Sequence, residues 1–203
     1  MDEVVIMQRI ICVGDSITWG EGVFPHLSSK SWPAILEQKL GDDFEVINLG
    51  LNGACLLDNG VMPYFQQSLS RVSYNYEADV ILFMLGTNDA KPIRWNAALF
   101  TDTLRKRAED YLALSPRPQV FLMIPPPQYV EVISSYSTDD SIIRGPLRQA
   151  IEQVADELDL ALIDLYTPLA NQARLFPDGS HPNSEANQIM ADEIYRVLER
   201  KYL

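Results

Sequence analysis

The chain has 203 residues, of which 47% are hydrophobic and 22% are charged, and these values are typical of a globular protein. The formal net charge of −12 gives an acidic surface that repels phosphate groups, which disfavours nucleic acid and anionic membranes as partners. No apolar run approaches the roughly 20 residues of a membrane-spanning helix, so stable membrane insertion is not expected.

The chain begins with an acidic stretch, residues 1–7, which lacks the basic start of a secretory signal. A cytoplasmic location is therefore expected, unless a leader has been removed. The length suits a single domain over residues 1–203. Cys12 and Cys55 lie in apolar surroundings, which predicts buried, reduced thiols rather than a disulfide framework. Two cysteines and two histidines also argue against a structural zinc site.

Five short apolar runs are nearly continuous rather than alternating, as in strands covered on both faces of a parallel sheet. They span residues 9–13, 44–48, 80–85, 119–124 and 161–165. Helical spacing predicts helices over residues 31–40, 62–70, 97–114, 146–158 and 183–202. This alternation predicts an α/β three-layer sandwich: a five-stranded, mostly parallel, flavodoxin-like sheet with helices on both faces. The irregular stretch 125–140 is expected to form a functional loop.

Polar segments follow the first two predicted strands, at the edge where open α/β sheets build their sites. Gly14-Asp15-Ser16-Ile17-Thr18 comes directly after the first strand. A serine at such a turn can project its hydroxyl, and its N–H favours an anion, although the same serine could simply cap a helix. The glycine-rich segment 48–53 follows the second strand, where it can bring backbone N–H groups to a ligand or form an ordinary turn.

Two further polar segments follow the third strand and precede the last helix. In Gly86-Thr87-Asn88-Asp89 the Asn88 amide can donate to a developing oxyanion, with a simple turn as the alternative. In segment 178–183, Asp178 stands three residues before His181. The carboxylate can orient the imidazole and leave its other nitrogen free to take a proton, whereas the alternative is a solvated loop.

Taken together and in this order, the four segments resemble the signature blocks of the SGNH, or GDSL-type, hydrolases. The resemblance covers roughly residues 9–198. It implies that Ser16 is the nucleophile and that His181 is the general base, oriented by Asp178. Ile17 stands where the name-giving motif has leucine, an exchange that leaves the implied chemistry unchanged.

The resemblance also implies an oxyanion hole made of the Ser16 and Gly53 backbone N–H groups and the Asn88 side chain. Gly50 is the other candidate for the glycine donor, although the glycine of the family block aligns better with Gly53. Asp15 and Asp89 are expected to brace the turns rather than react.

Several residues outside these segments are candidates for the substrate pocket. Trp19, Trp95 and Tyr129 could line an acyl or sugar pocket, with core packing as the alternative for each. The segment 91–95 could contact an alcohol group. His26 is expected at the surface or at the rim of the site.

The resemblance implies serine-dependent hydrolysis of short-chain carboxylic esters through an acyl-enzyme, with O-acetyl groups on carbohydrates as candidate substrates. The expected partner is a small-molecule ester, and no cofactor or metal is implied. Alternatives are a lysophospholipase or thioesterase for longer acyl chains, and a non-catalytic binding module on the same fold. Nucleotide or flavin binding is disfavoured, because residues 14–18 lack the glycine spacing of a dinucleotide fingerprint. A homo-oligomer is compatible with the sequence, which does not specify the oligomeric state.

Overall fold

The computed structural model describes residues 7–23, 29–131 and 134–203. The prediction for His26, most of the acidic N-terminal stretch and two residues of the loop 125–140 lie outside the described residues. Within them, no helix has the length and apolar character required to cross a bilayer.

The centre of the fold is a five-stranded sheet in which every pair of neighbouring strands is parallel. The order is β2-β1-β3-β4-β5, and the strands are β1 Gln8–Gly14, β2 Phe44–Gly50, β3 Val80–Met84, β4 Gln119–Ile124 and β5 Ala161–Asp164. The prediction of five strands in a flavodoxin-like order is confirmed. The chain leaves β1 toward β2 and later returns to β3 on its other side, so the connections diverge beside the end of β1.

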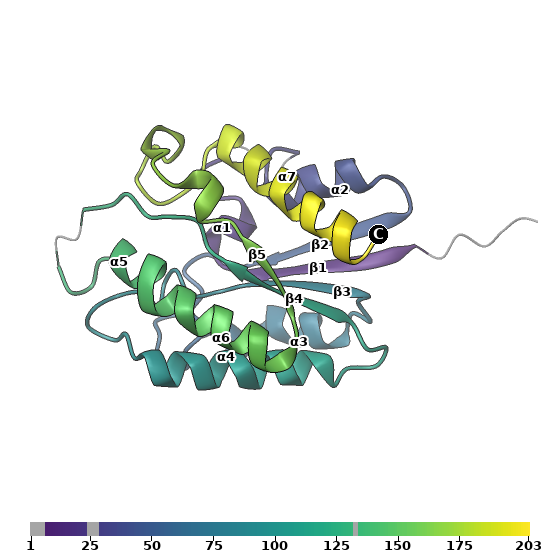
Figure 1. Ribbon diagram of the computed structural model, residues 1–203, viewed down its shortest axis with the longest axis horizontal. Helices are drawn as coiled ribbons and strands as arrows, with labels where there is room; N and C mark the ends of the chain where they lie inside the picture. The colour runs from purple at the N-terminus through teal and green to yellow at the C-terminus, as the bar shows by residue number, and fades with distance from the viewer. Residues whose placement is uncertain (1–6, 24–28, 132–133) are drawn as a thin grey trace, which may run out of the picture.

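Helices cover both faces of the sheet, with α2 Trp32–Leu40 and α7 Ser184–Lys201 on one face (Figure 1). The opposite face carries α3 Ser68–Asn75, α4 Ala97–Leu112 and α6 Arg148–Leu158. Successive strand residues serve the two layers in turn: Ile10 packs in the α2–α7 layer and Ile11 in the other. Both faces are therefore apolar, which explains the continuous hydrophobic runs.

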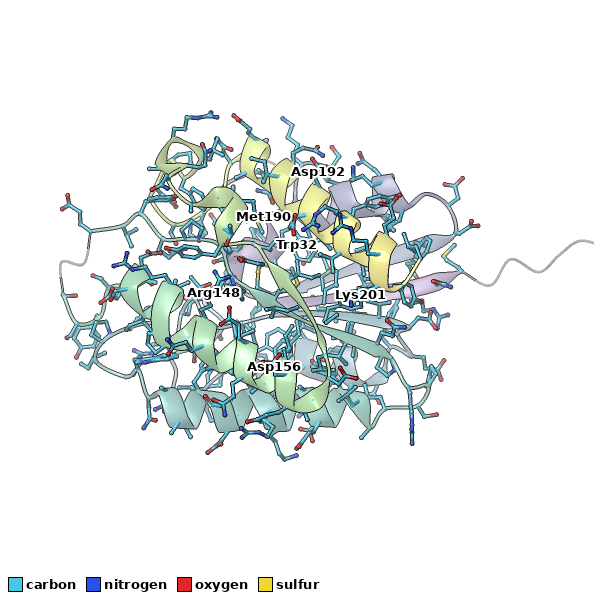
Figure 2. The ribbon with its side chains drawn as sticks, viewed as in Figure 1. Trp32, Arg148, Asp156, Met190, Asp192 and Lys201 are labelled. Atoms are coloured by element: carbon cyan, nitrogen blue, oxygen red, sulfur yellow. The ribbon has the colours of Figure 1, made fainter. Side chains whose placement is uncertain are left out.

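The α2–α7 layer is fixed by a polar contact inside its apolar core. Trp32 and Met190 are fully buried there (Figure 2). The Trp32 backbone N–H donates to Asn187 Oδ1 at 2.9 Å, and Asn187 is itself fully buried. The contact joins the first turn of α2 to α7 and holds α7 in place on the sheet. Cys12 and Cys55 are buried free thiols, as predicted.

The structure corrects the predicted helix over residues 62–70. A 3₁₀ turn spans Tyr64–Gln66, and α3 begins only at Ser68. Gln67 between them is extended, with φ −96° and ψ 161°, while the buried Tyr64 hydroxyl donates to Leu49 O at 2.9 Å. This tertiary bond fixes the 3₁₀ turn where the periodicity predicted a continuous helix.

Two other short helices were not predicted. The four residues of α1 Ser16–Trp19 are too few to produce a periodic pattern. The three residues of α5 Asp140–Ile142 lead into a π-helical turn, Ile143–Leu147. Gly145 there has non-helical φ −107° and ψ −106°, so α6 starts at Arg148 rather than at residue 146.

Candidate active site

Ser16 lies at the first turn after β1, at the carboxyl edge of the sheet. The Asp15 side chain caps α1 by accepting from the Ile17 N–H at 2.9 Å. A Cβ atom on Gly14 would lie 2.0 Å from the Thr18 hydroxyl oxygen, so only glycine permits the sharp turn there. The turn leaves Ser16 half-buried and facing a cavity.

His181 and Asp178 reach Ser16 from the loop that precedes α7. His181 Nε2 lies 3.0 Å from Ser16 Oγ, and His181 Nδ1 lies 2.6 Å from Asp178 Oδ2. The remaining oxygen, Asp178 Oδ1, accepts from the backbone N–H groups of Ser180 at 2.9 Å and His181 at 2.7 Å. Residues separated by more than 160 positions thus form one continuous hydrogen-bonded chain.

The environment of Asp178 favours its ionised form. Its partial burial alone would raise the pKa of the carboxyl group. Hydrogen bonds from the backbone and ring of His181 and from the Ser180 backbone outweigh that effect and lower the pKa below its ordinary value. A carboxylate held in this way fixes the tautomer of the imidazole and leaves Nε2 facing the serine hydroxyl.

The loop that carries His181 is fixed by contacts which the sequence gave no reason to predict. Buried Gln128 accepts from the Ser180 hydroxyl at 2.6 Å, and its amide donates to Ser180 O at 3.3 Å. On the other side, a Cβ atom on Gly22 would lie 2.7 Å from Pro182 O and 3.0 Å from the His181 Cβ atom. Gly22 has a φ of +93° and approaches the histidine backbone more closely than any side chain would allow.

Three hydrogen-bond donors lie around the same cavity. Ser16, Gly53 and Asn88 all line it. The Gly53 N–H has no hydrogen-bond acceptor among the described residues. Asn88 Nδ2 donates one proton to Ala54 O at 3.1 Å, which leaves its second proton for a ligand.

Gly50 is placed differently from Gly53. Its N–H donates to Asn48 Oδ1 at 2.9 Å, so this donor is already used. A Cβ atom on Gly50 would lie 2.2 Å from the Trp19 backbone nitrogen, which shows that the glycine allows α1 to pack on β2. Of the two candidate glycines, Gly53 is the one whose N–H remains unpaired within the described chain.

Two buried carboxyl groups lie beneath the site, as expected for residues that brace its turns. Asp89 is fully buried and accepts from the backbone N–H groups of Leu56 at 2.8 Å and Leu57 at 2.9 Å. It thereby ties the loop after β3 to the loop after β2. Burial raises the pKa of Asp89 and the pKa of Asp15 to about 6 each.

The cavity beside Ser16 has a volume of about 350 Å³. Seven residues line it: Ser16, Glu21, Asn52, Gly53, Asn88, Asp178 and His181. Glu21 and Asn52 belong to no recognised motif, and sequence reasoning did not select them. Within the part of the chain that the structure describes, no group of three or more His, Cys, Asp or Glu side chains is placed to hold a metal ion.

The three aromatic pocket candidates lie outside this lining. The Trp95 ring packs on Phe100, with 5.1 Å between ring centroids. The Tyr129 hydroxyl donates to Leu169 O at 2.6 Å and accepts from the Gln172 N–H at 2.8 Å. Trp19 is half-buried at the end of α1. A role for these three residues in substrate binding stays a prediction.

The fold is shared with several solved structures. The aryl esterase of M. smegmatis matches with a TM-score of 0.80 at 22% identity, over 95% of this chain and 99% of its own. A carbohydrate acetylesterase family member from Sinorhizobium meliloti matches with a TM-score of 0.76 at 24% identity, over 96% of this chain and 98% of its own. These matches confirm the predicted α/β architecture.

The sequence comparisons identify the family. An acetylxylan esterase from Xylanibacter ruminicola is 28% identical over 210 residues, a match that covers 94% of this chain and 43% of that protein. The chain thus spans less than half the length of this relative. The model of the GDSL-like lipase/acylhydrolase family matches residues 12–189, which include Ser16, Asn88 and His181. The predicted resemblance is confirmed: the chain belongs to the GDSL-like lipase/acylhydrolase family.

Proposed function

We propose that the protein hydrolyses short-chain carboxylic esters, with Ser16 as nucleophile, His181 as general base and Asp178 as the group that orients the histidine. The observation that carries this proposal is the continuous chain from Asp178 Oδ2 to His181 Nδ1 at 2.6 Å and from His181 Nε2 to Ser16 Oγ at 3.0 Å. Both distances suit proton transfer from a serine hydroxyl to an imidazole whose second nitrogen is paired with a carboxylate.

In the proposed first step, Ser16 Oγ attacks the ester carbonyl carbon as His181 Nε2 takes the hydroxyl proton. The carbonyl π electrons move onto oxygen, which becomes a tetrahedral oxyanion. When the oxyanion collapses, the bond to the alcohol oxygen breaks and His181 gives its proton to that oxygen. Water, deprotonated by the same histidine, then attacks the acyl-enzyme and releases the acid and free Ser16.

The Ser16 N–H, the Gly53 N–H and the Asn88 amide are the donors proposed for the oxyanion. All three residues line the cavity, and the second Asn88 amide proton and the Gly53 N–H remain available within the described chain. Donors fixed before the reaction stabilise charge that develops only in the transition state. Asn88 is fixed by its bond to Ala54 O, and the loop of Gly53 is fixed by Asp89 through Leu56 and Leu57.

We propose O-acetyl groups on carbohydrates as the substrate class. The name of the Xylanibacter ruminicola relative supports this choice, as does a cavity of about 350 Å³ with a mainly polar lining. Longer acyl chains, as in a lysophospholipase or thioesterase, would need an extended apolar groove, and no aliphatic side chain lines the described cavity. The expected single domain and cytoplasmic location stay predictions.

A series of nitrophenyl esters from acetyl to dodecanoyl, together with acetylated xylan, tests this function. We expect the highest kcat/KM for acetyl and butyryl esters, and release of acetate from the polysaccharide. The Ser16→Ala variant should lose all of these activities, whereas Ser68→Ala, at an exposed position on α3, should retain them. A maximum at octanoyl or longer chains would favour the lipid substrates. No turnover of any ester by a folded protein would favour a binding module.

A further inference from the structure

Two polar side chains in the wall of the Ser16 cavity have no part in the proposed acyl transfer. Glu21 and Asn52 line the cavity together with the nucleophile, the histidine and the proposed oxyanion donors. Glu21 follows α1, and its backbone N–H donates to Ser16 O at 2.9 Å. Asn52 directly precedes Gly53. The two side chains therefore come from the same two turns that present the nucleophile and the glycine donor.

The two side chains are joined to each other. Asn52 Nδ2 donates to Glu21 Oε2 at 3.0 Å, which links the turn after β1 to the turn after β2. Asn52 is the one side-chain hydrogen-bond partner of Glu21 within the described residues, and none of their lysines or arginines forms an ion pair with it. Glu21 Oε1 is left with unused lone pairs, and Asn52 keeps its carbonyl oxygen and one amide proton.

This arrangement of free acceptors and one donor suits a substrate rich in hydroxyl groups. A sugar hydroxyl can donate to the Glu21 carboxylate and accept from the Asn52 amide, and a hydrogen bond to a charged group is stronger than one between neutral groups. A nitrophenyl group offers no hydroxyl for such a contact. The pair therefore distinguishes alcohols by their hydroxyl groups.

Charge limits the substrate class further. Glu21 and Asp178 both line the cavity, no lysine or arginine does so among the described residues, and the whole chain carries a net charge of −12. A phosphate or carboxylate on the alcohol side of the ester would meet these carboxylates without a compensating cation. Phospholipids and coenzyme thioesters carry such anionic groups, whereas acetylated neutral sugars do not.

We propose that Glu21, held by Asn52, is a specificity-determining residue that binds a hydroxyl group of a neutral sugar next to the scissile acetyl ester and disfavours anionic alcohols. This inference rests on the proposed ester hydrolysis at Ser16. It identifies the side chain through which that site distinguishes one class of alcohol from another.

Three acetyl esters measured on the Glu21→Gln variant test the inference: a monoacetylated methyl xyloside, 4-nitrophenyl acetate and 4-acetoxybenzoate. Glutamine keeps the shape of the side chain and removes its charge. We expect kcat/KM for the sugar ester to fall about tenfold, mainly through KM, because a charge-assisted hydrogen bond is lost. The value for 4-nitrophenyl acetate should change less than about twofold, and the value for anionic 4-acetoxybenzoate should rise several-fold. Added salt should raise that last value in the wild type but not in the variant.

The matched control is Glu199→Gln, which removes one negative charge from an exposed position on α7 and should leave all three values unchanged. Asn52→Ala, which releases the Glu21 carboxylate, should change the ratios in the same direction by a smaller factor. Equal loss on all three esters, or no change in their ratios, would overturn the inference. A folded wild-type protein that hydrolyses none of the three would instead contradict the proposed function, so the two failures are distinguishable.

Discussion

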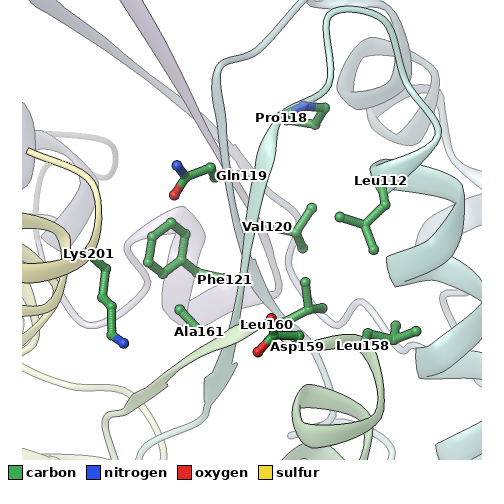
Figure 3. Close-up of a pocket in the computed structure, with 10 residues that line it drawn as sticks. All are labelled: Leu112, Pro118, Gln119, Val120, Phe121, Leu158, Asp159, Leu160, Ala161 and Lys201. Carbon is green, nitrogen blue, oxygen red and sulfur yellow. The ribbon is translucent and has the colours of Figure 1, made fainter.

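Two cavities at opposite edges of the sheet differ in chemistry more than in size. The larger, about 500 Å³, lies at the amino edge, between the starts of β4 and β5 and the ends of α4, α6 and α7 (Figure 3). Its lining combines apolar side chains, such as Val120 and Leu160, with isolated polar ones such as Lys201 and Gln119. The smaller, about 350 Å³, lies at the carboxyl edge around Ser16.

The difference shows that converging polar groups identify the site and that volume does not. Around Ser16, an imidazole, a carboxylate and several N–H donors from four separate loops face one another. In parallel sheets the loops at the carboxyl edge are free to carry such groups, and they meet where the chain connections diverge. The amino-edge cavity is lined by no serine, histidine or cysteine.

Asp178→Asn should cause the largest loss of activity among the variants that sharpen this comparison. An amide at this position can hold the wrong tautomer of His181, which then presents an N–H to Ser16 instead of a free lone pair. We expect kcat to fall by about 10⁴-fold with little change in KM. The exposed Asp42 provides the control, since Asp42→Asn removes the same charge at the distant α2–β2 connection. Retention of more than a tenth of the activity would remove Asp178 from the mechanism.

Asn88→Ala should cause the next largest loss. Removing one oxyanion donor raises the barrier by roughly 3 kcal/mol, so we expect kcat to fall by about 10²- to 10³-fold. KM should change little, because the donor acts on charge that develops in the transition state. Asn75→Ala, on the exposed end of α3, should have no effect in the same steady-state assay. An equal rise in KM and unchanged kcat would mean that Asn88 only binds the ground state.

Asp89 predicts a smaller effect, on stability rather than activity. Since burial raises its pKa to about 6, the folded state binds its proton more tightly than the unfolded state does. Its contribution to the free energy of unfolding is therefore fully present at low pH and is lost as the pH rises through about 6. The stability of the wild type relative to Asp89→Asn should fall by about 1 kcal/mol between pH 5 and pH 7.5.

Denaturant unfolding of the two proteins at both pH values measures this difference, and Asp15, present in both, largely cancels. A stability difference that is constant or increases with pH would show that the Asp89 carboxyl group is already ionised at pH 5. In that case its hydrogen bonds to Leu56 and Leu57 would outweigh its burial.

The amino-edge cavity predicts the smallest effect. Lys201→Ala changes its only cationic lining residue, far from the carboxyl edge of the sheet. We expect kcat and KM for acetyl esters to stay within about twofold of the wild type, as for most surface substitutions. A loss of tenfold or more without unfolding would break the comparison, because it would connect the larger cavity to the chemistry at Ser16.

The sequence predicted the sheet and the proposed reacting groups for physical reasons. Strands buried on both faces produce uninterrupted apolar runs, and the roles of Ser16 and His181 depend on motifs that are contiguous in the chain. The supporting contacts carry no such signal. Gln128 binds the His181 loop from 52 residues away, and Glu21 meets Asn52 across two loops. The helix over residues 62–70 was wrong because a bond from Tyr64 to Leu49 O decides the local structure there.

Covalent labelling with a fluorophosphonate tests the central claim most directly, because this reagent phosphonylates an activated serine as fluoride leaves. Peptide mapping by mass spectrometry should find a single adduct, on Ser16, with ester hydrolysis lost in proportion to labelling. The Ser16→Ala variant should remain unlabelled, and His181→Ala should be labelled far more slowly than the wild type. A protein that hydrolyses esters while Ser16 stays unmodified, or an inactivating adduct on another residue, would contradict the assignment of Ser16 as the nucleophile.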